Sequence, residues 1–204
     1  MRATILVGTL KKTGLSNTAT LSEFLSRRLE QKGVECRTVR LVDRAIPAGT
    51  CSDVGEGDEW PDILQGVVAS DIIIVATPIW WNNHSSLIQR IIERLDELHD
   101  DVMAGKPSPL EGKVGGIVIT GDSDGAQTII GALCNFFNGI GLLIPPYATL
   151  SVLWERQSKG SEPSKDELLR KYEADYAGTA DRMVRELLRF ASIERAGPAT
   201  PQAT

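Results

Sequence analysis

The sequence predicts a doubly wound α/β fold, with a five-stranded parallel sheet and helices on both of its faces. Apolar runs of strand length alternate along the chain with segments whose apolar residues recur at helical spacing. The apolar runs are continuous, as expected for parallel strands that are covered on both sides. We expect a single domain over residues 1–196, followed by a small, polar, frayed tail at 197–204.

The first expected strand covers residues 3–8, an apolar run that ends in glycine. A helix should follow, because apolar residues recur at helical spacing up to Leu29 and Gly33 then supplies a left-handed cap. Residues 34–42 form the next expected strand. After an irregular stretch, Pro61 suits the first turn of a short second helix.

The strongest strand signal lies at 71–78, where four β-branched residues in succession disfavour a helix. A third helix is expected over about 87–98, a fourth strand at 114–120 and a fourth helix at 126–138. A last strand near 148–153 precedes a final helix. Its start is marked by the capping box that runs from Ser164 to Glu167.

Composition limits the classes of partner. The chain has 204 residues, of which 42% are hydrophobic and 24% charged, and it carries no apolar run of membrane-spanning length. Its net charge of −5 is dispersed, and no stripe of basic residues interleaved with aromatics appears, so we expect neither a nucleic-acid nor a membrane partner. The first residues resemble a strand rather than an export signal, which predicts a cytoplasmic protein. Cys36, Cys51 and Cys134 lack C-x-x-C spacing, so we predict reduced thiols and no metal site.

Ligands of doubly wound sheets bind outside the carboxyl ends of the strands, and three segments should meet there. The first segment, 8–18, is rich in hydroxyl and amide groups and leads into a helix start that suits a phosphate. It matches neither G-x-x-x-x-G-K nor G-x-G-x-x-G. A purely structural alternative is that Ser16 and Asn17 cap the helix while Gly14 turns the chain.

The second segment, 77–86, carries two adjacent tryptophans, Trp80 and Trp81, in a loop between an apolar strand and an apolar helix. A planar aromatic ligand would explain these rings, and so would packing under the loop or against a partner subunit. We interpret His84 as an exposed loop or near-cap residue, because no carboxylate or nucleophile accompanies it.

The third segment, 120–127, places two glycines around short polar residues, which lets the backbone approach a ligand closely. Its carboxylates, Asp122 and Asp124, are what a turn and a helix start require, and we favour that interpretation over a cation site.

Together these segments resemble, in order and spacing, the three FMN loops of the NAD(P)H-dependent FMN and quinone reductases of flavodoxin-like fold. The most specific match is Thr77-Pro78-Ile79-Trp80-Trp81-Asn82, in which Trp80 stands where the family commonly has Tyr. Some relatives carry an added cysteine cluster for iron and sulfur, and Cys51 alone stands in that region here. The resemblance implies FMN as bound cofactor, NAD(P)H as cosubstrate and a cofactor site made of three sets of residues: Thr9, Lys11, Ser16, Asn17 and Thr18; Pro78, Ile79, Trp80, Trp81 and Asn82; Thr120, Gly121, Asp122 and Gly125.

The function that this resemblance implies is hydride transfer from NAD(P)H through FMN to a small-molecule acceptor such as a quinone or another flavin, with no catalytic side chain. Two alternatives are a flavodoxin-type electron carrier and a flavin-free binding module of the same fold. Members of the family often form dimers or tetramers, so the resemblance implies a homodimer or homotetramer. Adjacent side chains in an extended segment point in opposite directions, so we expect Trp80 to contact flavin and Trp81 to pack beneath the loop or toward a neighbouring subunit.

Overall fold

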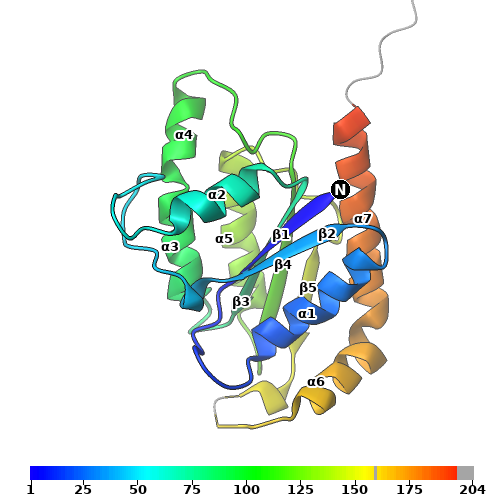
Figure 1. Cartoon of the computed structure of the whole chain (residues 1–204). Helices are drawn as coiled ribbons and strands as arrows, with labels where there is room; N and C mark the ends of the chain where they lie inside the picture. Colours follow the sequence, from blue (N-terminus) through cyan, green and yellow to red (C-terminus); the bar gives the residue numbers. More distant parts are fainter. Residues whose placement is uncertain (159, 197–204) are drawn as a thin grey trace, which may run out of the picture.

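The computed structural model describes residues 1–158 and 160–196, so the predicted tail at 197–204 lies outside the described residues. Its centre is a parallel sheet of five strands in the order β2-β1-β3-β4-β5 (Figure 1). The strands are β1 (Arg2–Val7), β2 (Glu35–Arg40), β3 (Ile72–Pro78), β4 (Val114–Gly121) and β5 (Thr149–Leu153). From β1 the chain adds β2 on one side and then β3, β4 and β5 on the other, so the direction of winding changes between β1 and β3. This topology confirms the predicted doubly wound α/β class.

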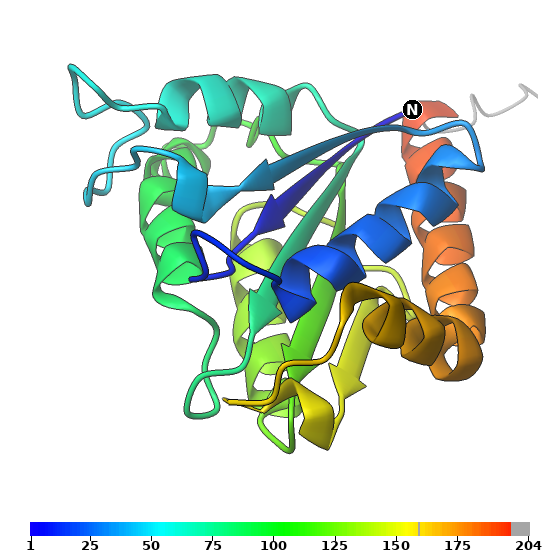
Figure 2. The same cartoon turned by 60° about the horizontal axis from the view of Figure 1, so that its bottom comes forward.

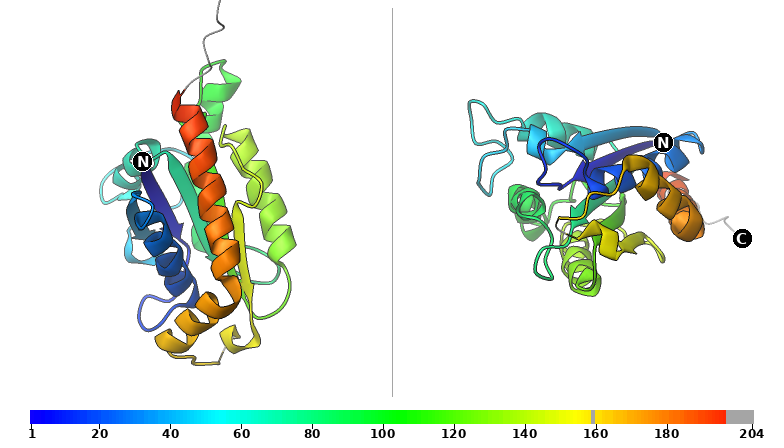
Figure 3. Two further views of the ribbon diagram at one scale, coloured as in Figure 1. Left: turned by 90° about the vertical axis from the view of Figure 1, so that its right-hand side faces the viewer. Right: turned by 90° about the horizontal axis from the view of Figure 1, so that it is seen from below.

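Helices cover both faces of this sheet, and Figure 3 shows the layers from the side. One face carries α1 (Asn17–Glu30), α6 (Lys165–Lys171) and α7 (Ala177–Ala196). The other carries α2 (Trp60–Val68), α3 (Ser86–Arg94), α4 (Asp96–Met103) and α5 (Ala126–Gly139). Apolar side chains of β1, β3 and β4 alternate between two buried clusters, one on each face, which explains why these strands read as continuous apolar runs.

Two element boundaries differ from the prediction. The strand expected at 34–42 is shorter, because a 3₁₀ turn at Leu41–Asp43 ends β2. The helix expected over 87–98 is two helices, α3 and α4, that meet at Leu95. The Leu95 N–H is shared between the carbonyls of Ile91 and Ile92, at 3.0 and 3.2 Å, which tightens the chain there. Acidic residues at the start of α4 then favour a new helix N-terminus.

The N-cap half of the predicted capping box is present, since the Ser164 hydroxyl accepts a hydrogen bond from the Glu167 N–H at 3.1 Å, whereas the Glu167 carboxylate pairs with Arg156. The final helix is nevertheless not one continuous α-helix. A π-helical turn at Tyr172–Tyr176 separates α6 from α7. Buried Tyr172 lies at the start of this turn, with its ring 5.7 Å from that of Phe24 on α1 in an edge-on arrangement. The hydrophobic periodicity of the sequence does not distinguish such a wide turn from a regular helix.

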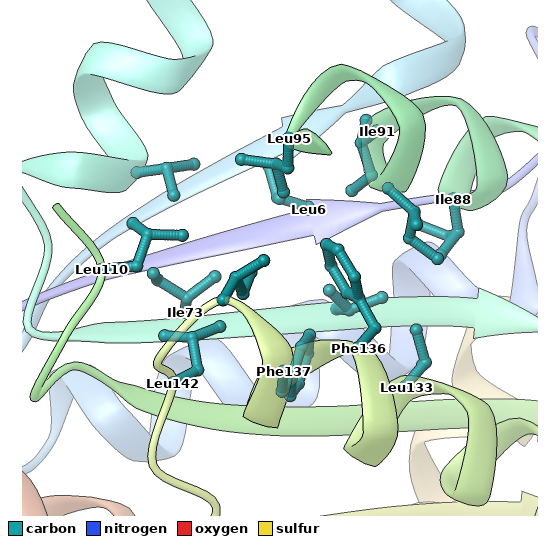
Figure 4. A pocket seen from close by; sticks show the side chains of 14 residues that line it. Leu6, Ile73, Ile88, Ile91, Leu95, Leu110, Leu133, Phe136, Phe137 and Leu142 are labelled. Atoms are coloured by element: carbon teal, nitrogen blue, oxygen red, sulfur yellow. The ribbon is translucent and has the colours of Figure 1, made fainter. Parts of the chain in front are cut away.

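The interior holds little empty space. Figure 4 shows a cavity of about 10 Å³ between the sheet and helices α3 and α5, lined by apolar side chains such as Leu6, Ile88, Leu133 and Phe137. A volume of this size holds one water molecule at most.

Within the described residues, no helix combines the length and apolarity needed to cross a membrane.

Candidate functional site

Three loops meet at the carboxyl edge of the sheet, which Figure 2 turns toward the viewer. Loop 1 (residues 8–16) follows β1, loop 2 (79–85) follows β3 and loop 3 (122–125) follows β4. The Thr18 and Thr120 hydroxyls are hydrogen-bonded to each other at 2.6 Å, which joins the start of α1 to the end of β4. The convergence expected from the topology is therefore present.

Loop 1 is held together by its own side chains and by one side chain from β2. The Ser16 hydroxyl donates to Thr9 Oγ1 at 2.8 Å, and both residues are buried. Lys11 Nζ donates to the Leu15 carbonyl at 3.1 Å, while Arg40 Nη2 donates to the Lys11 carbonyl at 2.8 Å. Carbonyl groups of loop 1 thus accept hydrogen bonds from the Lys11 ammonium and the Arg40 guanidinium, and these bonds restrict the backbone that precedes α1.

The start of α1 is a capped helix end. Ser16 Oγ accepts from the Ala19 N–H at 3.2 Å, and the Ser16 carbonyl accepts from Thr20 N at 2.9 Å. The N–H groups of Asn17 and Thr18 lie in the first turn, where a helix has no carbonyl of its own to accept from them. Such N–H groups can bind an anion. The capping role of Ser16 is confirmed, and its part in a phosphate site stays a prediction. Thr18 differs, because its hydroxyl is engaged with Thr120 in the interior.

Loop 2 is a two-residue hairpin. Trp80 and Asn83 exchange backbone hydrogen bonds of 2.8 and 2.9 Å, and the two residues between them, Trp81 and Asn82, have φ angles of 49° and 63°. This geometry is that of a type I′ turn, which favours Asn or Gly at both central positions and makes a tryptophan at the first one costly. The loop ends where the Ser85 N–H donates to Thr77 Oγ1 at 2.9 Å and Ser85 caps α3.

The hairpin corrects one prediction about its rings. Trp81 was expected to pack beneath the loop or toward a neighbouring subunit, and the first of these is wrong, since the side chain is 93% exposed in the protomer. The left-handed turn explains the error, because it carries the side chain out to solvent, whereas the prediction assumed an extended segment. Trp80 is 42% exposed.

His84 is half-buried rather than exposed, and it precedes the α3 cap. Its Nε2 is within hydrogen-bonding distance of Gln89 Oε1, at 2.9 Å. Nδ1 is buried and has no partner among the described residues. The near-cap position is as predicted.

Loop 3 packs closely on loop 2. A Cβ added at Gly121 would lie 2.6 Å from Ile79 Cδ1, and one at Gly125 would lie 2.9 Å from the Asn82 Cα. Gly125 also has a φ of 94°, which other residues rarely adopt. Glycine is thus required at Gly125, where the neighbouring atom is backbone, whereas at Gly121 a larger residue would first have to displace the end of the Ile79 side chain. Asp122 is exposed, and its carboxylate accepts from the Ser123 hydroxyl at 3.2 Å, which agrees with the turn interpretation.

The prediction omitted a fourth segment at this edge. A 3₁₀ turn at Glu155–Gln157 follows β5, and its Gln157 carbonyl accepts from Asn17 Nδ2 at 3.4 Å. The strand order places the end of β5 beside that of β4, and the Trp154 N–H donates to the Gly121 carbonyl at 3.0 Å. No motif in the sequence marks this segment, so only the order of the strands would have revealed it.

The fold and the converging loops define a flavodoxin-like α/β protein whose open site is at the carboxyl edge. Residues 1–153 match the model of the family described as NADPH-dependent FMN reductase. The chain belongs to this family. Membership confirms the resemblance stated above, and the description of the family is that of an FMN reductase that uses NADPH.

Two relatives are more than 30% identical to this chain. The 8-demethyl-8-aminoriboflavin-5'-phosphate synthase of Streptomyces davaonensis is 34% identical over 161 residues, which cover 72% of this chain and 62% of that protein. The divalent metal cation transporter MntH of Mycobacterium bovis is 33% identical over 153 residues, which cover 72% of this chain and 22% of the transporter. The chain thus spans less than two thirds of the length of either relative.

Among solved structures, RosB with a bound 8-demethyl-8-formylriboflavin-5'-phosphate intermediate aligns with a TM-score of 0.79 and 26% identity, covering 98% of this chain and 82% of RosB. An NADH:FMN oxidoreductase aligns with a TM-score of 0.66 and 16% identity, covering 98% of this chain and 91% of that one. The second likeness concerns the fold alone.

Proposed function

We propose that the protein transfers hydride from NAD(P)H through bound FMN to a small-molecule acceptor such as a quinone or another flavin. The observation that carries this proposal is the junction of three loops at one edge of the sheet, with a capped helix start on one side and a partly exposed tryptophan on the other. A phosphate suits the first of these features and an aromatic ring suits the second.

The residues present fit an FMN molecule. Polar side chains are concentrated in loop 1 and the first turn of α1, where Thr9, Lys11, Ser16, Asn17 and Thr18 lie. Gly121 at the end of β4 and Gly125 in loop 3 let the backbone there pack directly against loop 2.

In the proposed arrangement the start of α1 binds the phosphate, with Ser16 and Asn17 nearest to it and Thr18 acting through its backbone N–H. Pro78, Ile79, Trp80 and Asn82 hold one side of the ring and Thr120, Gly121, Asp122 and Gly125 line the other, with Trp80 as the stacking residue and Trp81 beside it at the rim. FMN supplies the redox chemistry when bound, by accepting hydride and passing two electrons on. The protein then needs to bind, orient and leave one ring face open, which requires no catalytic side chain.

Rapid mixing of the FMN-loaded protein with excess NADPH or NADH under anaerobic conditions tests the proposal. We expect the flavin absorbance to bleach without any partner protein, because the exposed loop 2 leaves room for a nicotinamide. A quinone added afterwards should restore the absorbance. If neither nucleotide reduces the flavin while a chemical reductant does, the protein is an electron carrier of the flavodoxin type. If the protein does not bind FMN, the proposal fails outright.

The family resemblance also supports a cytoplasmic location and a homodimer or homotetramer, and we include both in the proposal. The exposed Trp81 ring is a group that a second copy would cover. Sedimentation of the wild type, compared with a Trp81→Ala variant, tests the assembly.

A further inference from the structure

The outer edge of β5 is an unpaired strand edge. β5 pairs with β4 alone and is the last strand of the sheet (Figure 1). The Ala148 carbonyl accepts from β4 at 2.9 Å and the Trp154 N–H donates to β4 at 3.0 Å, so the even-numbered residues of this segment bond to β4. Backbone groups alternate in direction along a strand, and those of Thr149, Ser151 and Leu153 therefore point to the open side.

These outward backbone groups are largely without partners. The Tyr176 hydroxyl donates to the Leu153 carbonyl at 3.5 Å, and the second lone pair of that carbonyl stays available. The N–H and carbonyl groups of Thr149 and Ser151 form no hydrogen bond with another residue of the ranges 1–158 and 160–196. A hollow of about 430 Å³ between Thr149 and α7 opens beside the strand. A further strand therefore has access to this edge.

β5 also lacks the features by which sheet edges avoid pairing with other chains. Its sequence is Thr-Leu-Ser-Val-Leu, without a charged residue or a proline. β2, at the opposite edge of the sheet, carries Glu35, Arg37 and Arg40. Charged side chains on an edge strand oppose pairing with another chain, so β2 is protected and β5 is not. The β5 edge is thus the one that suits addition of a strand.

Tyr147, just before β5, belongs to the same surface. Its side chain is 61% exposed, and its φ of 62° is unfavourable for a residue with a Cβ. The Arg182 guanidinium of α7 lies over its ring, 4.9 Å from the ring centre. The protomer's core gains nothing from an exposed ring in a left-handed backbone, which indicates a role outside the protomer.

A second copy of the chain fits this edge in an antiparallel register centred on Ser151. Thr149 of each copy then lies opposite Leu153 of the other, and all the facing residues have outward backbone groups, so each pair exchanges both hydrogen bonds. The two-fold axis is perpendicular to the sheet, which keeps equivalent faces on the same side. In this register Tyr147 lies opposite Glu155 of the second copy.

The charges at the two ends of the edge are complementary in that register. Trp154 has extended backbone, so the exposed Glu155 continues the direction of β5. Asp175 and, with a smaller effect, Glu155 raise the pKa of Lys171 on α6, which indicates that the Glu155 carboxylate lies on the face covered by α6 and α7. Arg182 is exposed on α7, on that same face. The pairing therefore brings each Arg182 toward a Glu155 of opposite charge.

We propose that the β5 edge is an interface at which two copies of the chain join their sheets into one continuous sheet. The inference specifies one contact of the assembly proposed above, and it does not depend on flavin binding. The exposed Trp81 lies in loop 2, after β3, whereas this interface runs along β5. The two surfaces are therefore distinct.

An exchange of charges tests the register. Arg182→Glu and Glu155→Arg each set like charges against each other, and each should raise the dissociation constant of the β5 pairing by about tenfold or more. The double variant restores opposite charges and should return the constant to within about threefold of the wild type. Sedimentation equilibrium of the FMN-free proteins over a series of concentrations measures these changes.

Arg185→Glu is the matched control. Arg185 is exposed on α7, one helical turn beyond Asp181, which pairs with Arg28 of α1 and so lies on the side away from β5. The same charge change at Arg185 should leave association as in the wild type.

Ser151→Pro tests the strand pairing itself, because it removes an N–H that points away from β4 and sets a ring against the incoming strand. It should shift the protein toward smaller species and leave FMN affinity within about twofold of the wild type, since Ser151 lies outside the three loops. If this variant has a lower melting temperature, the charge exchange decides.

A wild type that is monomeric at every concentration would overturn the inference, as would single charge variants that sediment like the wild type. A double variant that fails to restore association would overturn the proposed register and the inference with it. In each of these cases the proposed hydride transfer is unaffected. A wild type that assembles as described but binds no FMN would defeat the proposed function alone.

Discussion

At the residue scale, Trp81 combines two unfavourable properties. Its φ of 49° is left-handed, and its side chain is 93% exposed. A non-glycine residue in this conformation costs about 1–2 kcal/mol relative to the right-handed one. Asn tolerates it much better, which is why Asn is preferred in type I′ turns. Folding of the protomer therefore gains nothing from tryptophan at this position.

We expect Trp81→Asn to raise the free energy of unfolding by about 1 kcal/mol, because it relieves the strained turn without removing a buried ring. Urea unfolding at a fixed, low protein concentration measures the change. Gln65→Asn is the control, because Gln65 is exposed on α2 and its replacement does not affect the conformation of a turn. A loss of stability that grows with protein concentration would instead show that the Trp81 ring is buried between copies.

The rings of loop 2 also show where sequence reasoning succeeds and where it stops. The pair Trp80-Trp81 predicted an aromatic loop at the carboxyl edge of the sheet, where the structure has it. Position along the chain and the order of the strands are enough to place a loop at that edge. The direction of each ring depends on the hairpin. Its left-handed turn could not be predicted from the sequence, because such turns are normally marked by Asn or Gly and the first central residue here is a tryptophan. The turn at Glu155–Gln157 was missed for a related reason, since its contact with Asn17 joins residues that lie 140 positions apart along the chain.

At the scale of elements, the long connection between β2 and α2 is fastened to α3 by one buried cation. Arg94 Nη2 donates to Asp58 Oδ2 at 2.5 Å, and both side chains are fully buried. The same guanidinium donates to the carbonyls of Cys51 and Pro47, at 2.6 and 3.1 Å. Helical spacing had indicated the apolar face of α3 correctly. It did not indicate that an arginine on this helix holds an irregular loop, because charged residues are expected to be solvated.

The hydrogen bond from Arg94 holds the pKa of Asp58 below its usual value. A carboxyl group with a depressed pKa contributes stability that is present above its unfolded pKa of about 3.9 and is lost as the pH falls through the folded value. Asp58→Asn should therefore cost about 3–5 kcal/mol at pH 7, because it leaves a buried guanidinium uncompensated. It should also flatten the loss of stability below about pH 4.

Denaturant unfolding of the wild type and Asp58→Asn between pH 7 and pH 3 measures both effects. Asp62→Asn is the control, since Asp62 is exposed in the first turn of α2 and its replacement should cost less than about 1 kcal/mol. A similar, small cost for both variants would show that the buried pair does not hold the loop.

At the scale of the whole molecule, the candidate site links elements from both faces of the sheet. Loop 1 leads to α1 on one face, while loop 2 and loop 3 lead to α3 and α5 on the other. A ligand that contacts all three loops binds only the folded chain. The sequence predicted this convergence well, because apolar strands and their order determine where the loops lie, whereas the widened turn at Tyr172–Tyr176 and the break at Leu95 depend on packing.

Bound FMN should therefore stabilise the whole fold. At a free concentration 100 times its dissociation constant, we expect the free energy of unfolding to increase by about 2.7 kcal/mol. Thermal melts over a series of FMN concentrations measure the increase, with AMP as a phosphate monoester that lacks the isoalloxazine ring. An equal shift with AMP would assign the stabilisation to the phosphate alone, and no shift with FMN would contradict binding.

The position of α7 in the chain has a consequence for biosynthesis. Its Met183, Leu187 and Ala191 are buried against the sheet together with residues of α1, although they are among the last described residues to be made. Until α7 has been synthesised, one face of the nascent sheet lacks this cover and its apolar side chains are exposed. We therefore expect this face to complete its folding only after residue 191 has left the exit tunnel.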